Sequence, residues 1–330
     1  MEVKKLDNSE VEISAEISSE AFARTRGEAM KNLKKLVKID GFREGTAPDN
    51  IVERHVGSGA ILEEMADIAV RNNYQTIMEE AKVEAIGRPI LTITKIAVGE
   101  PLGIKIKTAV MPVIKLPDYK SIAKKETSKG KESFEPTEKE IEDVLGEIKK
   151  MRTAEGGAPA DLTDEFVKTL GKFENVEDFK NRIKTNIKLE KEIKARDKKR
   201  VEILEGIVSK LEVVLPSVLI EVELDKMVAD LKNDLSHSGI DFADYVAKTG
   251  KTESILRDDI RPSAEKRAKF GLILSEIGKL EKLEVEKEEL ERETEAMLSH
   301  FKGADPERAG HYVEGQLMNE KVFQFIENIK

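Results

Sequence analysis

The chain contains no cysteine and no tryptophan among its 330 residues, and aromatic residues make up only 5%. The absence of cysteine excludes disulfides, thiolate zinc sites and cysteine nucleophiles. No apolar run approaches the length needed to cross a bilayer, and the first residues, MEVKKLD, lack the apolar stretch of a secretory signal. We therefore expect a soluble protein of a reducing cytoplasm, with no membrane partner.

Charged and apolar residues are nearly balanced. They make up 37% and 39% of the chain, which suits long amphipathic helices with wide solvated faces better than one thick core. A length of 330 residues favours two or three units over one compact domain. The net charge of −9 repels nucleic acid, so DNA is not an expected partner and any contact with RNA needs a local basic island.

The residues that commonly carry chemistry form no recognisable site. The histidines belong to no His-Glu-x-x-His motif and adjoin no nucleophile motif; they are His55, His237, His300 and His311. The GSG segment at residues 57–59 is too short to cradle a phosphate and is interpreted as a connection between helices. The sequence therefore predicts no catalytic residue, no metal site and no cofactor.

Residues 1–113 contain apolar residues both at the alternating spacing of strands and at the spacing of helices. Alternating apolar residues predict a strand at residues 11–15. Two further strands are expected at residues 90–98 and 102–113, and two helices at residues 29–37 and 61–69. The order of strand, helices and hairpin predicts a small α+β domain.

A polar segment, residues 115–136, is expected to run extended as a linker. After it, Thr137 and Glu140 have the spacing of a capping box, which predicts the start of a helix. The apolar stripe of that helix consists of Ile141, Val144, Leu145, Ile148 and Met151. Two glycines and a proline within residues 154–160 are predicted to end it.

Helical periodicity dominates residues 161–330, and no strand is expected there. Pro216 is predicted to begin one helix, and Pro262 to kink or begin another. Asp305 followed by Pro306 fits an N-cap with proline at the first helical position. The predicted fold class is therefore α+β but mainly α, with a small α+β N-terminal domain joined to an elongated, irregular all-α domain.

Charge is uneven along the helical part. Residues 180–200 contain ten bases and three acids, whereas residues 281–295 contain eight acids and three bases. Each run is interpreted as a solvated helix face, with a binding patch as the alternative.

Residues 41–48, with the sequence GFREGTAP, form the most informative segment. Its two glycines permit a tight loop and Pro48 suits the first turn of a following helix, so Phe42 and Arg43 would lie at the tip. Such a pair suits docking, since the ring can fill an apolar crevice while the guanidinium pairs with phosphate or carboxylate. Residues 31–54 hold six bases and four acids, a local charge of +2. The alternative is a plain turn with Phe42 packed into its own core.

These eight residues closely resemble the ribosome-docking signature of bacterial trigger factors, a Gly-Phe-Arg-x-Gly-x-x-Pro loop. The similarity to that N-terminal domain continues at residues 39–40 (ID), 50–52 (NIV) and 87–89 (GRP). Residues 214–220 (VLPSVLI) and 265–274 (EKRAKFGLIL) resemble the family's C-terminal chaperone domain. The resemblance covers most of the chain, and both domains occur in the family's order.

The resemblance implies an ATP-independent cytoplasmic chaperone that docks at the ribosomal exit and holds nascent or unfolded polypeptides. Residues 1–113 would be the ribosome-binding domain, 114–160 a linker and arm helix, and 161–330 a helical cradle for clients. The docking residues implied are Gly41, Phe42, Arg43, Glu44, Gly45 and Pro48. Client contacts are expected at Met227, Met297, Phe301, Tyr312 and Phe323. The implied partners are ribosomal protein and rRNA near the exit, and nascent or unfolded chains; exposed apolar surface is also compatible with a homodimer of free molecules.

The sequence departs from the family pattern at two places. Glu44 stands where family members often carry lysine, which reverses a charge beside an RNA-rich surface. The family also inserts a prolyl-isomerase domain of FKBP type before the helical domain, whereas only a short GGAPA stretch joins residues 152 and 161 here. That domain is therefore predicted to be absent.

Two other functions stay open. A prolyl isomerase would need clustered aromatic residues around a twisted amide, and residues 113–160 offer only Tyr119 and Phe134. A holdase or assembly chaperone that does not bind ribosomes would show the same apolar helical stripes. Cosedimentation with ribosomes separates this last alternative from a docking chaperone.

Overall fold

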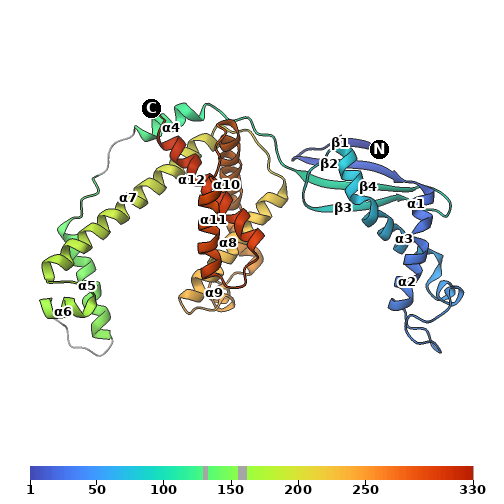
Figure 1. The fold of residues 1–330 in the computed structure, drawn as a ribbon, viewed down its shortest axis with the longest axis horizontal. Helices are drawn as coiled ribbons and strands as arrows, with labels where there is room; N and C mark the ends of the chain where they lie inside the picture. The colour runs from blue at the N-terminus through green and yellow to red at the C-terminus, as the bar shows by residue number, and fades with distance from the viewer. Residues whose placement is uncertain (129–132, 155–161, 330) are drawn as a thin grey trace. The chain divides into compact units, whose positions relative to one another are not determined.

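A computed structural model describes residues 1–128, 133–154 and 162–329, without the side chains of 151–154. The chain forms two compact units. One consists of Met1–Ile114 with Glu212–Lys269, and the other of Lys115–Leu211 with Phe270–Lys330. Helices predominate and one four-stranded sheet is present among the described residues (Figure 1). The predicted fold class, α+β and mainly α, is confirmed, whereas the domain limits at residues 113 and 160 stay predictions.

The first unit contains the sheet and the predicted N-terminal helices. Its strands are β1 (Glu2–Lys5), β2 (Glu10–Ile17), β3 (Ala85–Lys95) and β4 (Leu102–Val110). Its helices are α1 (Ser19–Arg24), α2 (Arg26–Leu36), α3 (Asp49–Ala81), α8 (Ser217–His237), α9 (Phe242–Lys248) and the first part of α10 (Glu253–Leu280). The strands and helices predicted before residue 113 correspond to β2, β3, β4, α2 and α3.

The second unit is helical throughout its described residues. Its helices are α4 (Tyr119–Thr127), α5 (Glu138–Ala154), α6 (Asp164–Leu170), α7 (Val176–Val208), the end of α10, α11 (Lys287–His300) and α12 (Pro306–Glu327). The prediction of no strand after residue 161 is confirmed for residues 162–329.

The sheet separates an apolar face from a charged one. Its antiparallel order is β1-β2-β4-β3, and the register places Ile13 opposite Ile106, both fully buried. On the other face, the Glu12 carboxylate and the Lys105 ammonium form a 3.0 Å ion pair. Because successive side chains of a strand point to opposite faces, this alternation leaves one face for helices to cover. α3 packs over it, and its Ile61 joins the same core.

Gly57 interrupts α3 with a φ of +82°, a left-handed conformation that glycine adopts without penalty. Two helical segments therefore meet at this residue. The interpretation of residues 57–59 as a connection between helices is confirmed.

In the first unit, ion pairs connect α8 to the start of α10. Glu221 contacts Arg257 at 2.9 Å and Arg261 at 2.7 Å. Pro216 is the N-cap of α8, as predicted. Pro262 instead lies inside α10, so of the two predicted roles, a kink or a helix start, the start is wrong and the kink stays a prediction. Proline lacks the backbone N–H that an ordinary helix residue donates, and Pro262 occupies an exposed position of α10.

The segment expected to be an extended linker contains a helix, α4, so that prediction is wrong. Asp118 caps α4 by accepting a 3.1 Å hydrogen bond from the Ser121 N–H. Tyr119 and Ile122 are buried at 8% exposure each, and α4 packs along α7. A Cβ on Gly206 would lie 2.9 Å from the Ile122 side chain, so this glycine lets α4 approach α7 closely. The helix forms because neighbouring helices cover its few apolar residues.

The predicted capping box begins α5. Thr137 N–H donates to the Glu140 carboxylate at 2.8 Å, and Glu140 N–H donates to the Thr137 hydroxyl at 3.3 Å. A hydrogen bond from Lys191, together with those from Thr137, lowers the pKa of Glu140 to about 2. The start predicted for α5 is therefore confirmed, whereas the predicted helix end at residues 154–160 falls mostly outside the described residues.

α5, α6 and the beginning of α7 share a small core of their own. Its buried members are Ile141, Leu145, Val167, Phe179 and Ile183. The Phe173 and Phe179 rings meet edge to face, with centroids 4.9 Å apart. This cluster consists of side chains packed against each other.

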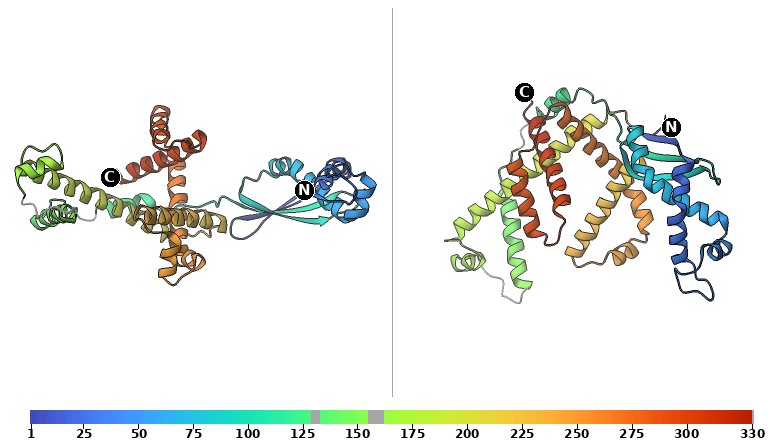
Figure 2. Two further views of the ribbon diagram at one scale, coloured as in Figure 1. Left: turned by 90° about the horizontal axis from the view of Figure 1, so that it is seen from below. Right: turned by 45° about the vertical axis from the view of Figure 1, so that its right-hand side comes forward.

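α11 and α12 form a helical hairpin (Figure 2). Asp305 caps α12 by accepting a 2.9 Å hydrogen bond from Arg308 N–H, with Pro306 in the first turn, as predicted. In the part of the chain that the structure describes, no helix has both the length and the apolar content to cross a membrane. Those residues also contain no group of three or more His, Asp and Glu side chains suited to a metal ion.

Candidate docking loop

Residues 41–48 join α2 to α3 and expose the predicted tip. The side chain of Phe42 is 43% exposed, and Arg43 and Glu44 are exposed beside it. Gly41 and Gly45 have φ values of +85° and +82°, which other residues adopt only with strain. The glycines therefore shape the turn that presents Phe42 to solvent.

The base of the loop is fastened to α2. The Gly45 N–H donates to the Lys34 carbonyl at 2.9 Å, and the Lys34 ammonium pairs with the Asp49 carboxylate at 2.5 Å. The Thr46 hydroxyl donates to the Arg43 carbonyl at 2.7 Å. Ala47 is buried at 5% exposure and joins the core of the first unit. The tip is thus held by its own backbone and by the base, while its side chains stay free.

This geometry contradicts the alternative in which Phe42 packs into its own core. Within the described ranges, neither Arg43 nor Glu44 forms an ion pair, so both charges face solvent. An exposed aromatic ring beside an unpaired guanidinium can fill an apolar crevice and bind an anionic group at once. The six residues predicted for docking lie together in this one loop, and docking itself stays a prediction.

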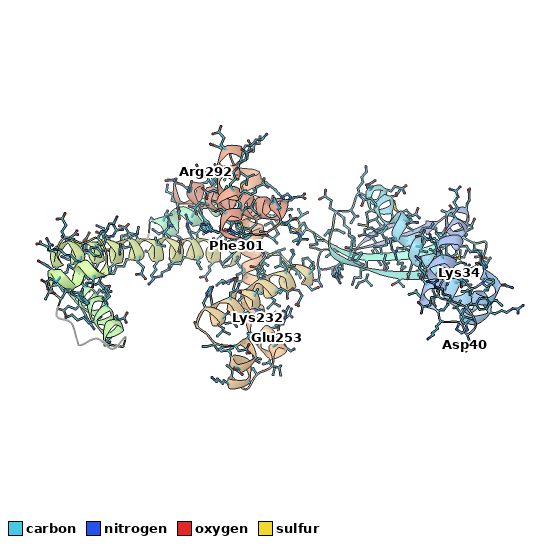
Figure 3. The ribbon with its side chains drawn as sticks, turned by 60° about the horizontal axis from the view of Figure 1, so that its bottom comes forward. Lys34, Asp40, Lys232, Glu253, Arg292 and Phe301 are labelled. Carbon is cyan, nitrogen blue, oxygen red and sulfur yellow. The ribbon has the colours of Figure 1, made fainter. Side chains whose placement is uncertain are left out.

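The five residues predicted for client contact lie on or beside three helices, α8, α11 and α12. Met297 lies on α11, Phe301 at its C-terminal end and Tyr312 on α12, so these three belong to the α11–α12 hairpin. Phe301 is 63% exposed and Tyr312 is 58% exposed; Figure 3 labels Phe301. Phe323 also lies on α12, but the Arg200 guanidinium covers its ring at 4.7 Å. Met227 lies on α8, in the first unit.

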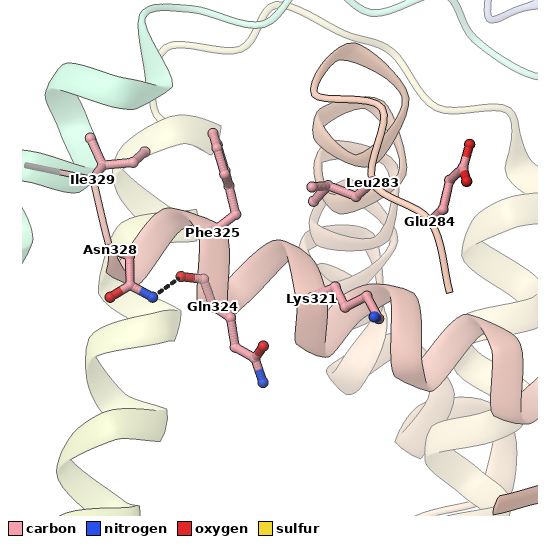
Figure 4. Close-up of a pocket in the computed structure, with 7 residues that line it drawn as sticks. All are labelled: Leu283, Glu284, Lys321, Gln324, Phe325, Asn328 and Ile329. Atoms are coloured by element: carbon pink, nitrogen blue, oxygen red, sulfur yellow. Dashed lines mark hydrogen bonds between the residues drawn. The ribbon is translucent and has the colours of Figure 1, made fainter. Parts of the chain in front are cut away.

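The prediction missed a shallow groove of about 480 Å³ beside the end of α12. Figure 4 shows the Phe325 ring between Leu283 and Ile329, with Lys321 and Glu284 at the rim. Phe325 is also approached by the Lys120 ammonium, 5.5 Å from the ring centroid. No sequence motif marks the groove, because its residues come from α12, the residues just after it, and the distant connection between α10 and α11.

Family models for known proteins match this chain in two places. The model described as bacterial trigger factor protein (TF) matches residues 1–148, and the model of the trigger factor C-terminus matches residues 175–330. The chain belongs to the trigger factor family. Between them the models leave only residues 149–174 unmatched, and the family predicted from the sequence is confirmed.

Trigger factors of two bacteria resemble the chain along its whole length. That of Clostridium botulinum (strain Langeland) is 24% identical over 425 residues, covering 100% of this chain and 99% of the relative. That of Halothermothrix orenii is 27% identical over 422 residues, covering 100% and 97%. Both alignments are longer than the 330 residues of this chain, so the relatives contain additional residues. The matched models are those of the trigger factor N- and C-terminal parts, and neither describes an isomerase domain.

A solved structure described as "Promiscuous Substrate Recognition in Folding and Assembly Activities of the Trigger Factor Chaperone" shares the fold. It matches with a TM-score of 0.57 and 16% identity, covering 100% of both chains. Trigger factors are chaperones, so the predicted chaperone function is confirmed at the level of the family.

Proposed function

We propose that this trigger factor docks on the ribosome through residues 41–48 and holds nascent or unfolded polypeptides without ATP or another cofactor. The observation that carries the proposal is the exposed Phe42–Arg43 pair on a loop fastened at its base. An exposed aromatic side chain in a stable fold is a common feature of binding anchors. The partner surface is ribosomal protein and rRNA near the nascent-chain exit, and the site of action is the cytoplasm.

Client holding is assigned to the apolar side chains that stay exposed on the helical frame. The α11–α12 hairpin contributes Phe301, Tyr312 and the half-buried Met297. Such side chains can bind many sequences, because apolar contact has no directional requirement. Free molecules would cover part of this surface by forming a homodimer. Neither DNA nor a membrane is proposed as a partner.

Cosedimentation of the wild-type chain with vacant ribosomes tests the proposal. We expect saturable binding that weakens as salt rises, because phosphate contacts release counterions. A chain that protects unfolded clients but never sediments with ribosomes would instead be a ribosome-independent holdase.

Glu44→Lys is expected to tighten ribosome binding, most strongly at low salt. The substitution replaces an exposed anion by a cation next to Phe42 and Arg43. If the new cation meets one phosphate, the slope of log affinity against log salt steepens by about 0.7 to 0.9. The measurement is a binding titration at two salt concentrations, with Glu84→Lys as a control that changes the net charge equally at another exposed position. Equal effects of the two substitutions would mean that Glu44 does not face the ribosome.

The chain is expected to show no prolyl-isomerase activity. The Phe173 and Phe179 rings contact each other edge to face, and both side chains pack in the α5–α7 core instead of lining a pocket of clustered aromatic residues. Isomerisation of a prolyl peptide should therefore keep its uncatalysed time of tens to hundreds of seconds. A peptide cis/trans assay measures this, and acceleration that disappears in the Phe173→Ala variant would contradict the expectation.

Replacing Phe301 and Tyr312 together by Ala is expected to weaken client protection. Each ring removed from the client-binding surface costs about 1 kcal/mol, so losing both should raise the concentration for half-protection roughly thirtyfold. Light scattering of an aggregating client measures it. The matched control is Leu189→Ala with Val201→Ala, two exposed apolar residues on α7. If the control loses as much protection, holding is spread evenly over exposed apolar residues.

A further inference from the structure

Leu36 is an apolar residue without a structural reason for its exposure. It is the last residue of α2, and its side chain is 75% exposed. The inner face of the same helix is formed by Ala29, Met30 and Leu33, all buried. Leu36 therefore adds nothing to the core, and its leucine side chain stays in water beside charged neighbours.

The docking loop adjoins this end of α2. Lys34, two residues before Leu36, accepts the backbone hydrogen bond from Gly45, and the Phe42 N–H donates to the Ile39 carbonyl at 3.1 Å. In Figure 1 the loop lies beyond the C-terminal end of α2. Figure 3 labels Lys34 on α2 and Asp40 just before the loop. Leu36 and Phe42 are thus exposed apolar side chains at one end of the same unit.

Exposed cations lie close to Leu36 in the sequence. Lys31, Lys35 and Lys38 are exposed and form no ion pair with any residue that the structure describes, whereas Lys34 is neutralised by Asp49. With Arg43 they make four exposed cations within residues 31–44, against two exposed acids, Asp40 and Glu44. This local excess of positive charge complements phosphate, although the chain as a whole carries −9.

We infer that Leu36 is a second apolar anchor of the docking surface and that Lys31, Lys35 and Lys38 bind phosphates around it. The inference rests on the proposed function, because the partner is the same ribosomal RNA–protein surface. Two apolar anchors held by one helix end and one braced loop give the docked molecule an orientation, while the lysines supply salt-dependent attraction. Leu36 is then a specificity-determining residue outside the Gly41–Pro48 signature.

Leu36→Ala tests the apolar anchor. Truncating an interfacial anchor should weaken ribosome binding roughly five- to thirtyfold, and the fold should be unaffected because the side chain is exposed. The matched control is Val98→Ala, which truncates an apolar side chain that is 78% exposed between β3 and β4. It should bind as the wild type does. Wild-type affinity in Leu36→Ala, or an equal loss in the control, overturns the inference.

Leu36→Lys separates an apolar crevice from a phosphate surface. In a crevice the buried ammonium would be costly, so binding should weaken at both low and high salt. Tighter binding than wild type at low salt would show that position 36 faces phosphates and would overturn the anchor.

Replacing Lys31, Lys35 and Lys38 together by Gln should flatten the slope of log affinity against log salt by about 0.7 to 0.9 for each phosphate that the variant no longer binds. An unchanged slope would mean that these lysines do not bind phosphates of the ribosome.

The Phe42→Ala and Arg43→Ala double variant separates the proposed docking through residues 41–48 from the inference about Leu36. If it binds ribosomes as the wild type does, the proposed docking function fails whatever Leu36→Ala does. If it loses binding and Leu36→Ala does not, the loop is the docking site and the inference about Leu36 alone is wrong.

Discussion

Replacing Phe42 and Arg43 together by Ala should weaken ribosome binding by about 2–4 kcal/mol, roughly thirty- to a thousandfold. The variant would lack the ring that fills an apolar crevice and the guanidinium that pairs with an anionic group. The fold should be unchanged, because Phe42 is 43% exposed and the contacts at the base of the loop use backbone groups and other side chains. Ribosome titration gives the affinity, and circular dichroism with thermal unfolding checks the fold.

The matched control removes one apolar side chain and one cation at another place on the first unit. Arg88 and Ile90 are exposed on β3, and Ile90 is 63% exposed. Their double replacement by Ala also deletes one cation and one apolar side chain, yet should leave ribosome binding within about twofold. Client protection should survive in both double variants. Unchanged binding in the loop variant would mean that residues 41–48 are only a structural turn.

Arg200→Ala is expected to destabilise the second unit by about 2–4 kcal/mol. Arg200 is 9% exposed; its Nε lies 2.6 Å from Glu327 Oε1, and its Nη1 lies 2.7 Å from Glu320 Oε2. Breaking a fully buried pair costs about 3–5 kcal/mol, and the partial exposure of both carboxylates lowers that figure here. The substitution also removes the cation over Phe323. α7 would then lose its main polar attachment to α12.

Hydrogen exchange measured along the chain would locate this loss. Amides of α7 and α12 should exchange faster in Arg200→Ala, while β2 and β4 keep their protection. Arg196→Ala is the control, since Arg196 is exposed and its nearest carboxylate oxygen, on Asp197, is 3.9 Å away. Its effect should stay within about 0.5 kcal/mol. Equal effects of the two substitutions would show that the buried cluster does not hold the helices.

The same cluster predicts an acid-sensitive contribution. Hydrogen bonding to Arg200 lowers the pKa of Glu320 below its usual range. The carboxylate is therefore stabilised in the folded state, and its contribution is complete above the ordinary carboxyl pKa. It is lost as pH falls through the lowered folded-state pKa. This part of the acid dependence should be absent in Arg200→Ala.

Local signals predicted much of the fold correctly. Alternation identified β2, helical stripes identified α2 and α3, and capping chemistry located Thr137 and Asp305 at helix starts. These features depend on residues close together in sequence, so a single chain displays them.

The missed elements depend on distant partners. β1 has the sequence EVKK, with a single apolar residue, and forms because β2 offers it a free edge. α4 lies in a polar segment, and its stabilising contacts come from α7 and α12. Arg200 meets Glu320 and Glu327 across more than a hundred residues, which no local pattern reveals.

The candidate docking site was predictable only in part. The glycines and Pro48 indicated a loop, but the exposure of Phe42 follows from the Lys34–Gly45 hydrogen bond and the Lys34–Asp49 ion pair. For client contact, apolar character alone did not separate the exposed Phe301 from Phe323, whose ring Arg200 covers.

Site-specific crosslinking from position 42 tests the docking of this trigger factor most directly. A photoreactive phenylalanine derivative would replace Phe42 in one variant and Val98, which is 78% exposed, in another. Both would be bound to ribosomes and irradiated. We predict a crosslink from position 42 to ribosomal protein or rRNA near the nascent-chain exit, and none from position 98. A complex that sediments intact but crosslinks only from position 98 would contradict docking through residues 41–48.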